Sequence, residues 1–340
     1  MTGDRSDYSG VWTLAETDGG RLARVSFELL ARGRVLADKR SAELTAVVMG
    51  CGVAEGDLAE LIHRGADGVL LVEAPELEHF LVEPQAACLG GLIAKHKPEI
   101  VIAAATTSGR TLMPYVAVKV RAGLTADCTG LDIEEGTGNL LQTRPAIGGN
   151  IMATIKTPDV RPQMATVRPR STRPPEADPT RTGEIRREDP PAELGGRVRR
   201  VEFIPATDVH ALGEADVVVS AGRGIKKGEN LPIVTELAEA LDAAVGASRD
   251  VVDREWLEYP HQVGLSGKTV SPRLYVAVGI SGAIQHLAGM QTAETIVAVN
   301  SDPDAQIFRV ADIGIVGDLF EVLPVLTKRI LMEKDGRSAP

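Results

Sequence analysis

A short segment near the C-terminus most constrains the fold. Residues 274–278 read Leu-Tyr-Val-Ala-Val, an apolar run of the kind that forms a strand buried on both faces. A turn bounded by glycines follows at Gly279–Gly282, and residues 283–290 have the composition of a helix. The order strand, glycine turn, helix predicts a parallel α/β layer whose turn presents backbone N–H groups to an anion.

The glycine spacing leaves two interpretations open. It is not the G-x-G-x-x-G of ordinary dinucleotide folds, and no Lys-Ser/Thr pair of a phosphate loop follows it. By pattern alone, a bound phosphate and a merely tight strand–helix turn explain the segment equally well.

The residues themselves point to one family. Residues 279–286 read Gly-Ile-Ser-Gly-Ala-Ile-Gln-His, residues 300–303 read Asn-Ser-Asp-Pro, and residues 311–319 read Ala-Asp-Ile-Gly-Ile-Val-Gly-Asp-Leu. In this order they resemble the FAD-binding segment of electron-transfer flavoprotein alpha subunits. Residues 143–150 and 161–169 also resemble that family, most closely the bacterial branch that includes electron-bifurcating members. The resemblance covers nearly the whole chain.

The N-terminal part alternates between strand-like and helix-like patterns, which predicts a nucleotide-binding-like α/β domain with helices on both faces of a parallel sheet. The expected strands are 11–15, 44–49, 68–73 and 100–104, and the expected helices are 21–39, 55–64, 83–96 and a segment ending at 121. Strand-like pieces at 124–132, 140–145, 148–155 and 164–167 predict a β-rich addition that completes this domain.

Residues 105–110, Ala-Thr-Thr-Ser-Gly-Arg, follow the strand 100–104 at a place where open α/β sheets commonly bind ligands. A nucleotide pocket is one interpretation. The other, which we favour, is a plain helix cap made by Thr106, Thr107 or Ser108, with Arg110 on the surface.

Composition divides the chain into residues 1–169, a linker 170–197 and residues 198–340. The linker is rich in Pro, Arg, Glu and Asp and has almost no large apolar residue, which predicts an exposed hinge. A nucleic-acid-binding tail is disfavoured, because acidic residues interleave the arginines and no aromatic offers a stacking surface. Beyond it we expect a Rossmann-like parallel sheet with strands at 198–204 and 217–220, a glycine turn at 222–226, and helices at 231–245 and 318–333.

The resemblance implies roles for individual residues. Arg223 would meet the diphosphate, Ser248 would hydrogen-bond the cofactor, and Arg249 would lie against the isoalloxazine. Within the loop 262–268, the Ser266 hydroxyl would approach flavin N5, whereas Leu265 stands where the family usually has Gln, so that polar contact is in doubt. The predicted cofactor-binding residues are Arg223, Ser248, Arg249, Gln262, Val263, Gly264, Leu265, Ser266, Gly279, Ser281, Gly282, Ala283, Ile284, Gln285, His286, Asn300, Asp318 and Leu319.

For three of these residues the resemblance names the part of the cofactor that they would meet, and two of the three also have a structural interpretation. The resemblance puts His286 near flavin O2, where a donor would stabilise charge on the reduced ring, although a lone histidine is more often structural. It puts Asn300 and Asp318 on the adenosine side. Asp318 also precedes the predicted final helix and has the residue type of an N-cap.

Other chemistries are disfavoured. The formal net charge is −10, which opposes binding to nucleic acid or anionic lipid. No apolar run approaches the roughly 20 residues of a membrane span, and residues 1–10 lack the features of a signal peptide, so we expect a cytoplasmic protein. Cys51, Cys88 and Cys128 form no C-x-x-C pair and predict small buried hydrophobes. No catalytic acid/base pair, nucleophile triad or metal motif is evident.

The resemblance implies an alpha subunit that carries FAD, pairs with a beta subunit and passes electrons between flavoenzymes such as an acyl-CoA dehydrogenase and a further acceptor. In bifurcating members, a second FAD in the beta subunit takes a hydride from NADH and splits the electron pair between ferredoxin and the dehydrogenase. The alternatives are a plain carrier with one FAD and AMP, a nucleotide-binding module without redox function, and a scaffold that keeps FAD only for structure.

Overall fold

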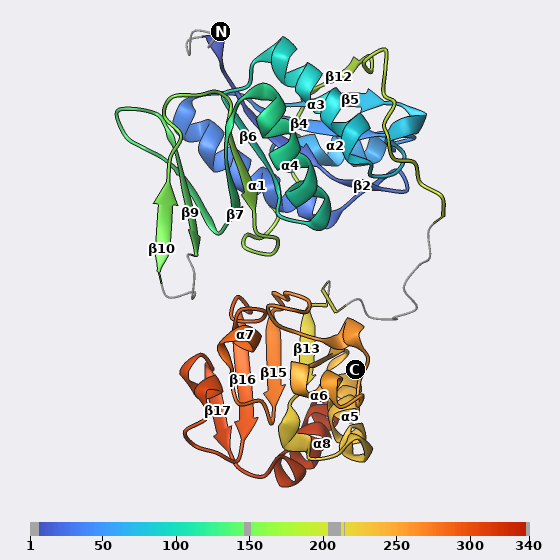
Figure 1. Ribbon diagram of the computed structural model, residues 1–340, viewed down its shortest axis with the longest axis vertical. Helices are drawn as coiled ribbons and strands as arrows, with labels where there is room; N and C mark the ends of the chain where they lie inside the picture. Colours follow the sequence, from blue (N-terminus) through green and yellow to red (C-terminus); the bar gives the residue numbers. More distant parts are fainter. Residues whose placement is uncertain (1–6, 146–150, 203–211, 214, 338–340) are drawn as a thin grey trace. The chain divides into compact units, whose positions relative to one another are not determined.

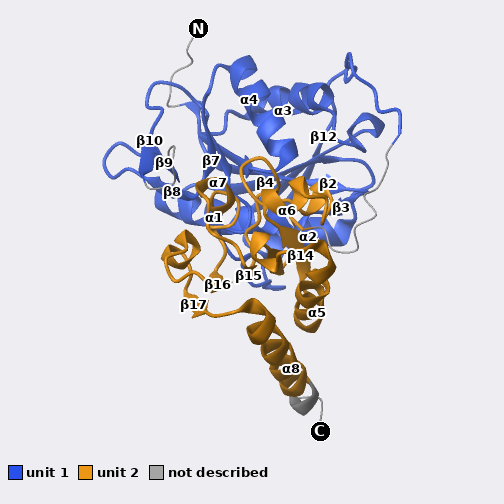
Figure 2. Cartoon of the chain, turned by 60° about the horizontal axis from the view of Figure 1, so that its bottom comes forward, with its two compact units in different colours: residues 1–204 blue, residues 205–340 orange. Residues whose placement is uncertain are grey.

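The computed structural model describes residues 7–145, 151–202, 212–213 and 215–337. The chain forms two compact units, residues 1–204 and residues 205–340, which are coloured separately in Figure 2. Residues 148–150 and 203–204, which belong to two of the predicted strands, lie outside the described residues.

Unit 1 is built on a seven-stranded sheet in which every neighbouring pair of strands is parallel (Figure 1). Across the sheet the order is β12 (Glu184–Glu188), β5 (Gly68–Glu73), β4 (Leu44–Gly50), β1 (Val11–Ala15), β6 (Ile100–Ala104), β11 (Gln163–Val167) and β7 (Gly123–Cys128). The four strands predicted for the N-terminal domain are present.

Helices cover both faces of this sheet because its strands are apolar on both sides. In β4, Leu44, Ala46 and Val48 face one core with α1 (Arg24–Arg40) and α2 (Glu55–His63). Val47 and Met49 face the other core, with α3 (Val82–His96) and α4 (Thr107–Val120). The period of two that alternates these side chains is the geometry of a strand, and the α/β class is confirmed.

A three-stranded antiparallel sheet, β10 (Met152–Ile155), β9 (Leu140–Pro145) and β8 (Gly130–Ile133), forms the β-rich addition (Figure 1). The piece expected at 124–132 is divided between β8 and β7, and β7 is an edge strand of the main sheet. The strand at 164–167 does not belong to the addition either. As β11 it lies inside the main sheet between β6 and β7, because its side chains are buried on both faces. Two short pieces, β2 (Thr17–Asp18) and β3 (Arg21–Leu22), pair separately, and η2 (Pro75–Leu77) precedes α3.

Residues 170–197 differ from the predicted exposed hinge. Within them, β12 adds a parallel edge strand to β5. Side chains of this strand form ion pairs with other elements of unit 1. Arg187 pairs with Glu55 and with Glu73 (Nη1–Oε2, 2.9 Å), and Glu188 contacts His96 at 3.0 Å. Backbone pairing, ion pairs and the apolar contacts of Ile185 and Leu194 attach the segment to the two cores of unit 1, so it belongs to unit 1.

Unit 2 is a five-stranded parallel sheet. Its order is β14 (Ala244–Ala247), β13 (Val217–Ala221), β15 (Leu274–Val278), β16 (Thr295–Asn300) and β17 (Ile313–Val316). The chain therefore starts in the interior of the sheet, goes to one edge, and returns to build outward on the other side of β13. This reversal of direction between β13 and β15 is the switch point of a doubly wound sheet, the Rossmann-like arrangement that was expected.

The two faces of this sheet are covered differently. Helices α5 (Pro232–Leu241) and α8 (Leu319–Arg337) pack on one face through Val234, Leu237 and Leu323 (Figure 1). The other face is covered largely by loops, which contribute Val263, Val270 and Ile307. The short elements are α6 (Arg249–Asp253), α7 (Ile284–Leu287), η3 (Arg223–Ile225), η4 (Gly228–Asn230), η5 (Tyr259–His261) and η6 (Gln306–Arg309).

Three predicted elements of unit 2 differ in extent. The helix expected at 283–290 has only the four residues of α7. The helix expected at 231–245 ends at Leu241, because Asp242 adopts the left-handed conformation (φ 54°) and β14 begins at Ala244. The described part of the strand expected at 198–204, residues 198–202, is not in a strand.

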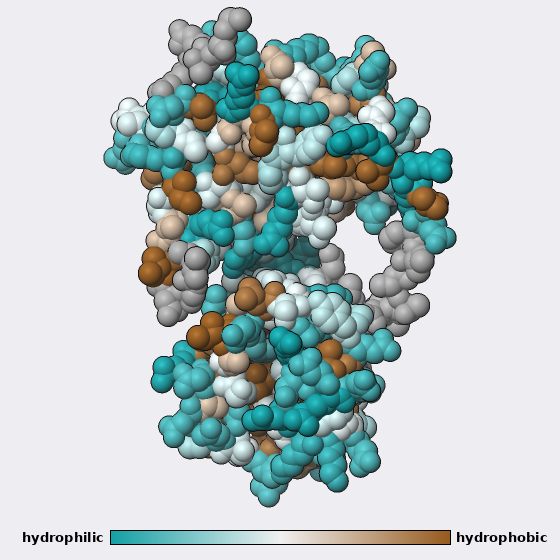
Figure 3. All heavy atoms as spheres, in the orientation of Figure 1, coloured by the Kyte–Doolittle hydropathy of each residue, from teal (hydrophilic) through white to brown (hydrophobic). Residues whose placement is uncertain are grey.

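Among the helices that the structure describes, none combines the length and the apolar character needed to cross a membrane. On the face drawn in Figure 3, hydrophobic residues are scattered among hydrophilic ones on both units and do not gather into one large patch.

Candidate cofactor site

The predicted cofactor-binding residues of unit 2 follow the ends of its strands. Arg223 comes after β13, Ser248 and Arg249 after β14, and residues 279–286 after β15; Asn300 ends β16, and Asp318 follows β17. Because all five strands are parallel, their carboxyl ends meet at one edge of the sheet, where ligands of open α/β sheets bind. The loop 262–268 joins this edge through a hydrogen bond from Val263 N to Ala247 O (2.9 Å).

Glycines bring the two turns at the switch point into direct contact. Gly222 N donates to Val278 O at 2.7 Å, and Gly224 N donates to Gly279 O at 3.0 Å. A Cβ on Gly222 would lie 2.2 Å from Gly279 O, and Gly279 itself has φ +61°. No other residue fits at this crossing without displacing backbone.

A third glycine closes the turn on its far side. Gly282 has φ +87°, and a Cβ there would lie 2.2 Å from Ile307 N. Ile307 N in turn donates to Ser281 O at 3.1 Å. The turn 279–282 is therefore held rigidly between the loop after β13 and the segment that contains Ile307.

The turn leaves its amides available to a ligand. Within the residues that the structure describes, the backbone N–H groups of Ser281, Gly282, Ala283 and Ile284 donate no hydrogen bond. Because α7 is only four residues long, a helix macrodipole contributes little, and the individual amides carry the attraction for an anion. Unpartnered amides beside glycines that permit close approach fit the diphosphate of a flavin nucleotide.

Two arginines follow the neighbouring strands β13 and β14 at this edge and remain accessible. The Arg223 side chain is 73% exposed, and its Nε lies 3.9 Å from Asp250 Oδ2. The Arg249 side chain is 72% exposed, and its Nε donates to Asp253 Oδ2 at 3.2 Å. These loose pairs leave most guanidinium donors free for an anionic ligand. Ser248 takes the N-cap position of α6, but its hydroxyl makes no capping bond there.

The loop 262–266 is tied to the segment after the turn. Leu265 N donates to Gln285 O at 2.7 Å, and a Cβ on Gly264 would lie 2.9 Å from the same oxygen. Gln262 is buried, and its Nε2 donates to Ser266 Oγ at 3.0 Å. The Leu265 side chain is 74% exposed. The structure therefore uses the Leu265 backbone for the fold and directs its apolar side chain outward.

His286 is 6% exposed, and both of its ring nitrogens have partners within unit 2. Nδ1 lies 3.1 Å from Val263 O, and Nε2 lies 2.9 Å from the Tyr275 hydroxyl. Burial lowers the pKa of His286 to about 4, so the ring is neutral at pH 7. The predicted donation to flavin O2 competes with these two contacts and stays a prediction. Sequence reasoning missed Tyr275, whose signal was a hydroxyl in an otherwise aliphatic strand.

The remaining predicted residues support the turns. Asn300 Nδ2 donates to Ile280 O at 2.8 Å, which anchors the turn after β15. Asp318 Oδ1 accepts from Phe320 N at 2.9 Å, so the predicted N-cap of the final helix is confirmed. Leu319 is buried, with its Cδ2 3.0 Å from the place where a Cβ on Gly279 would lie. The adenosine-side roles of Asn300 and Asp318 stay predictions.

At the corresponding edge of unit 1, the structure agrees with the plain helix cap. Thr106 Oγ1 accepts from Gly109 N at 3.1 Å and itself donates to Glu16 Oε1 at 2.5 Å. Burial raises the pKa of Glu16. Arg110 is exposed, with its Nη2 3.8 Å from Asp127 Oδ2. The Thr106 hydroxyl is thus engaged by the helix cap and by the Glu16 carboxyl group.

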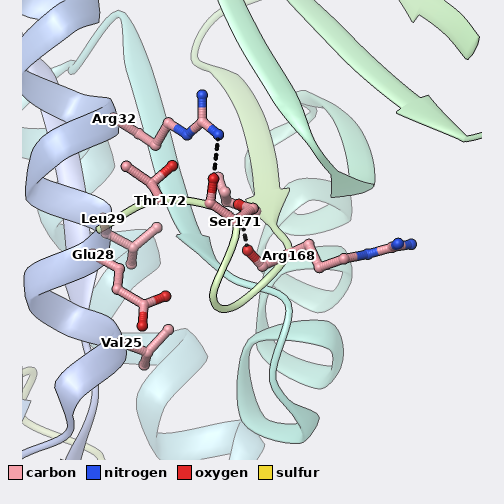
Figure 4. Close-up of a pocket in the computed structure, with 8 residues that line it drawn as sticks. Val25, Glu28, Leu29, Arg32, Arg168, Ser171 and Thr172 are labelled. Carbon is pink, nitrogen blue, oxygen red and sulfur yellow. Dashed lines mark hydrogen bonds between the residues drawn. The ribbon is translucent and has the colours of Figure 1, made fainter. Parts of the chain in front are cut away.

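Unit 1 also contains a small pocket between α1 and the segment after β11 (Figure 4). Arg32 Nη2 donates to Ser171 O at 2.8 Å across it, and Ser171 Oγ donates to Arg168 O at 2.7 Å. Its volume of about 10 Å³ holds about one water molecule, so it is no cofactor site.

A doubly wound parallel sheet with a glycine-tight switch point and unpartnered amides defines a protein of the α/β class, whose open sheets commonly bind nucleotides at this place. Residues 11–193 match the family model described as the electron transfer flavoprotein domain, and residues 211–291 match the electron transfer flavoprotein FAD-binding domain. The chain belongs to the family of electron transfer flavoprotein alpha subunits, and its C-terminal unit is a flavin-binding domain of that family.

Curated relatives match over nearly the full length. An electron transfer flavoprotein subunit alpha of Thermoanaerobacterium thermosaccharolyticum is 49% identical over 329 residues, covering 96% of this chain and 98% of the relative. One of Megasphaera elsdenii is 44% identical over 337 residues, covering 97% and 99%. The subunit LctC of lactate dehydrogenase (NAD(+),ferredoxin) of Acetobacterium woodii is 42% identical over 328 residues, covering 96% and 78%.

Proposed function

We propose that this alpha subunit binds FAD at the carboxyl edge of the unit 2 sheet and passes electrons between flavoprotein dehydrogenases and a further acceptor, as a heterodimer with a beta subunit. The observation that carries the proposal is the turn 279–284, with its glycine-enforced close approach and its unpartnered amides. Family membership supplies the redox context.

Some residues of this chain would bind the cofactor, and others would adjust its reduction potential. The amides of the turn and the Arg223 guanidinium would bind the diphosphate, because both offer donors to an anion. Bound FAD supplies the one- and two-electron redox chemistry. Arg249 would favour negative charge on the ring by proximity, although water screens a side chain that is 72% exposed. The loop 262–266 would fix the ring edge.

A bifurcating role is the more specific version of this proposal. The name of the A. woodii relative contains both NAD(+) and ferredoxin, and a relative in Anaerotignum propionicum, 39% identical over 371 residues, is named acryloyl-CoA reductase electron transfer subunit beta. These names favour NADH and ferredoxin as partners of the heterodimer, with an acyl-CoA dehydrogenase as the second acceptor. The alternative is a plain carrier with one FAD and AMP.

Co-purification with the beta subunit tests these versions together. The heterodimer is expected to release FAD on denaturation, and the number of flavins per heterodimer distinguishes one flavin with AMP from the two flavins of a bifurcating pair. In the bifurcating version, steady-state oxidation of NADH should then require both ferredoxin and the dehydrogenase as electron acceptors. Isolation of ATP without flavin would refute FAD binding, and a bound flavin that no physiological donor reduces would make the protein a scaffold.

A further inference from the structure

Tyr275 lies in the middle of the unit 2 sheet and is 0% exposed. On the sheet it pairs with Val218 and Ile296, and its ring belongs to an otherwise apolar core. A buried hydroxyl costs free energy unless it makes a hydrogen bond. The Tyr275 hydroxyl contacts His286 Nε2 at 2.9 Å, so the two buried side chains form one polar pair at the edge of the cofactor site.

The second contact of His286 decides which nitrogen carries the proton. Nδ1 lies 3.1 Å from the Val263 carbonyl, and a carbonyl oxygen can only accept. Nδ1–H therefore donates to Val263 O, and in the neutral ring Nε2 is left as an acceptor for the Tyr275 hydroxyl. Burial raises the pKa of Tyr275, so the hydroxyl keeps its proton and remains a donor.

The Val263 carbonyl is one of several backbone groups that hold the loop expected to meet the flavin. Gly264 N donates to Lys268 O at 3.1 Å and Leu265 N donates to Gln285 O at 2.7 Å. A Cβ on Gly289 would lie 2.5 Å from Gly264 Cα, so the loop and the segment after the turn touch without space for another side chain. A change in the His286–Val263 bond is therefore transmitted directly to residues 264–266.

We propose that Tyr275 is a positioning residue of the flavin site: its hydroxyl donates to Nε2 and fixes the orientation of the His286 ring, so that Nδ1–H anchors the loop 263–266 at Val263 O. The proposal rests on the proposed FAD site for its consequence, but not for its geometry. In the flavin-free chain His286 then acts through the loop, because its one ring N–H donates to Val263 O.

The wild-type protein provides the first test. In the flavin-free full chain labelled with ¹⁵N-histidine, the His286 ring should show a protonated Nδ1 and an unprotonated Nε2. A spectrum with the proton on Nε2, or with both nitrogens protonated at pH 7, overturns the proposal. This measurement needs no variant, so it decides even if substitutions at Tyr275 do not fold.

Tyr275→Phe provides the second test, with Tyr115→Phe in unit 1 as the matched control. Loss of the donor should free the His286 ring to reorient, weaken its bond to Val263 O and accelerate hydrogen exchange of the Leu265 amide by about fivefold, the equivalent of one net hydrogen bond. The flavin should be retained, with a shifted reduction potential. In the Tyr275→Phe background, the additional change His286→Gln should restore slow exchange of the Leu265 amide, because the glutamine amide can still donate to Val263 O.

A wild-type exchange rate of the Leu265 amide in Tyr275→Phe would refute the positioning role. If the protein proves to bind no flavin, the proposed function fails, while the tautomer and the exchange rates measured on the flavin-free chain still decide whether Tyr275 anchors the loop.

Discussion

Replacing His286 with Gln should remove a defined part of the pH dependence of unit 2 stability. The ring is buried as a neutral group, and burial lowers its pKa from 6.5 to about 4. In the unfolded chain the same ring is free to bind a proton below pH 6.5. The unfolded state therefore binds more protons between these values, and stability must fall as the pH falls through this window.

The size of the effect follows from the two pKa values. Stability from this group is fully present above pH 6.5 and lost as the pH approaches about 4. The whole interval corresponds to about 3 kcal/mol, and about 2 kcal/mol is already lost between pH 7 and pH 5. Glutamine does not titrate, so the His286→Gln variant should lack this component.

The chain is well suited to the assay because its two tryptophans lie in different units. Trp12 is buried in unit 1, and Trp256 lies in unit 2 beside Gly228. In a Trp12→Phe background, urea unfolding followed by tryptophan fluorescence reports unit 2 alone, and it is repeated at pH 7 and pH 5 on the flavin-free full-length protein. Equal losses of stability in the parent and in the His286→Gln variant would refute a neutral, buried histidine.

Three further predictions concern the site and the connection between the units. Gly282→Val should give colourless protein destabilised by about 2 kcal/mol or more, because its Cβ would meet Ile307 N at 2.2 Å; full flavin occupancy by absorbance would contradict this. Arg249→Ala should lower the flavin potential in a redox titration by less than about 59 mV, the equivalent of about 1.4 kcal/mol, and Arg254→Ala should leave it unchanged. Limited proteolysis should cut within the exposed residues 198–202 and leave flavin on the C-terminal piece; flavin on the N-terminal piece would refute the assignment.

Strand positions could be predicted from local patterns because buried parallel strands consist of short apolar runs. Residues 274–278 form β15 with the predicted bounds. The helix after the turn was predicted too long, since residues 283–290 have helical composition. Its end is set from outside: Gly289 packs against Gly264 at a distance that leaves no room for a side chain, and residues 288–290 turn to meet that loop.

The segment 170–197 shows the limit of composition as evidence. Few apolar residues predicted a solvated hinge, yet β12 joins the sheet beside β5. An edge strand needs backbone pairing on one side only, and here Arg187 finds Glu73, 114 positions earlier in the chain, while Glu188 finds His96. Such partners cannot be recognised from a window of neighbouring residues.

His286 shows which features of the site a sequence motif can indicate and which features depend on contacts with residues farther away in the chain. The features expected to grip the cofactor are local, because the glycines and amides of residues 279–284 act within one turn, and a sequence motif records them directly. The features that tune the site depend on contacts 11 and 23 positions away, to Tyr275 and Val263. The same motif therefore pointed correctly to the edge of the sheet and left open what its histidine contacts. The structure makes that side chain part of the scaffold that holds the loop.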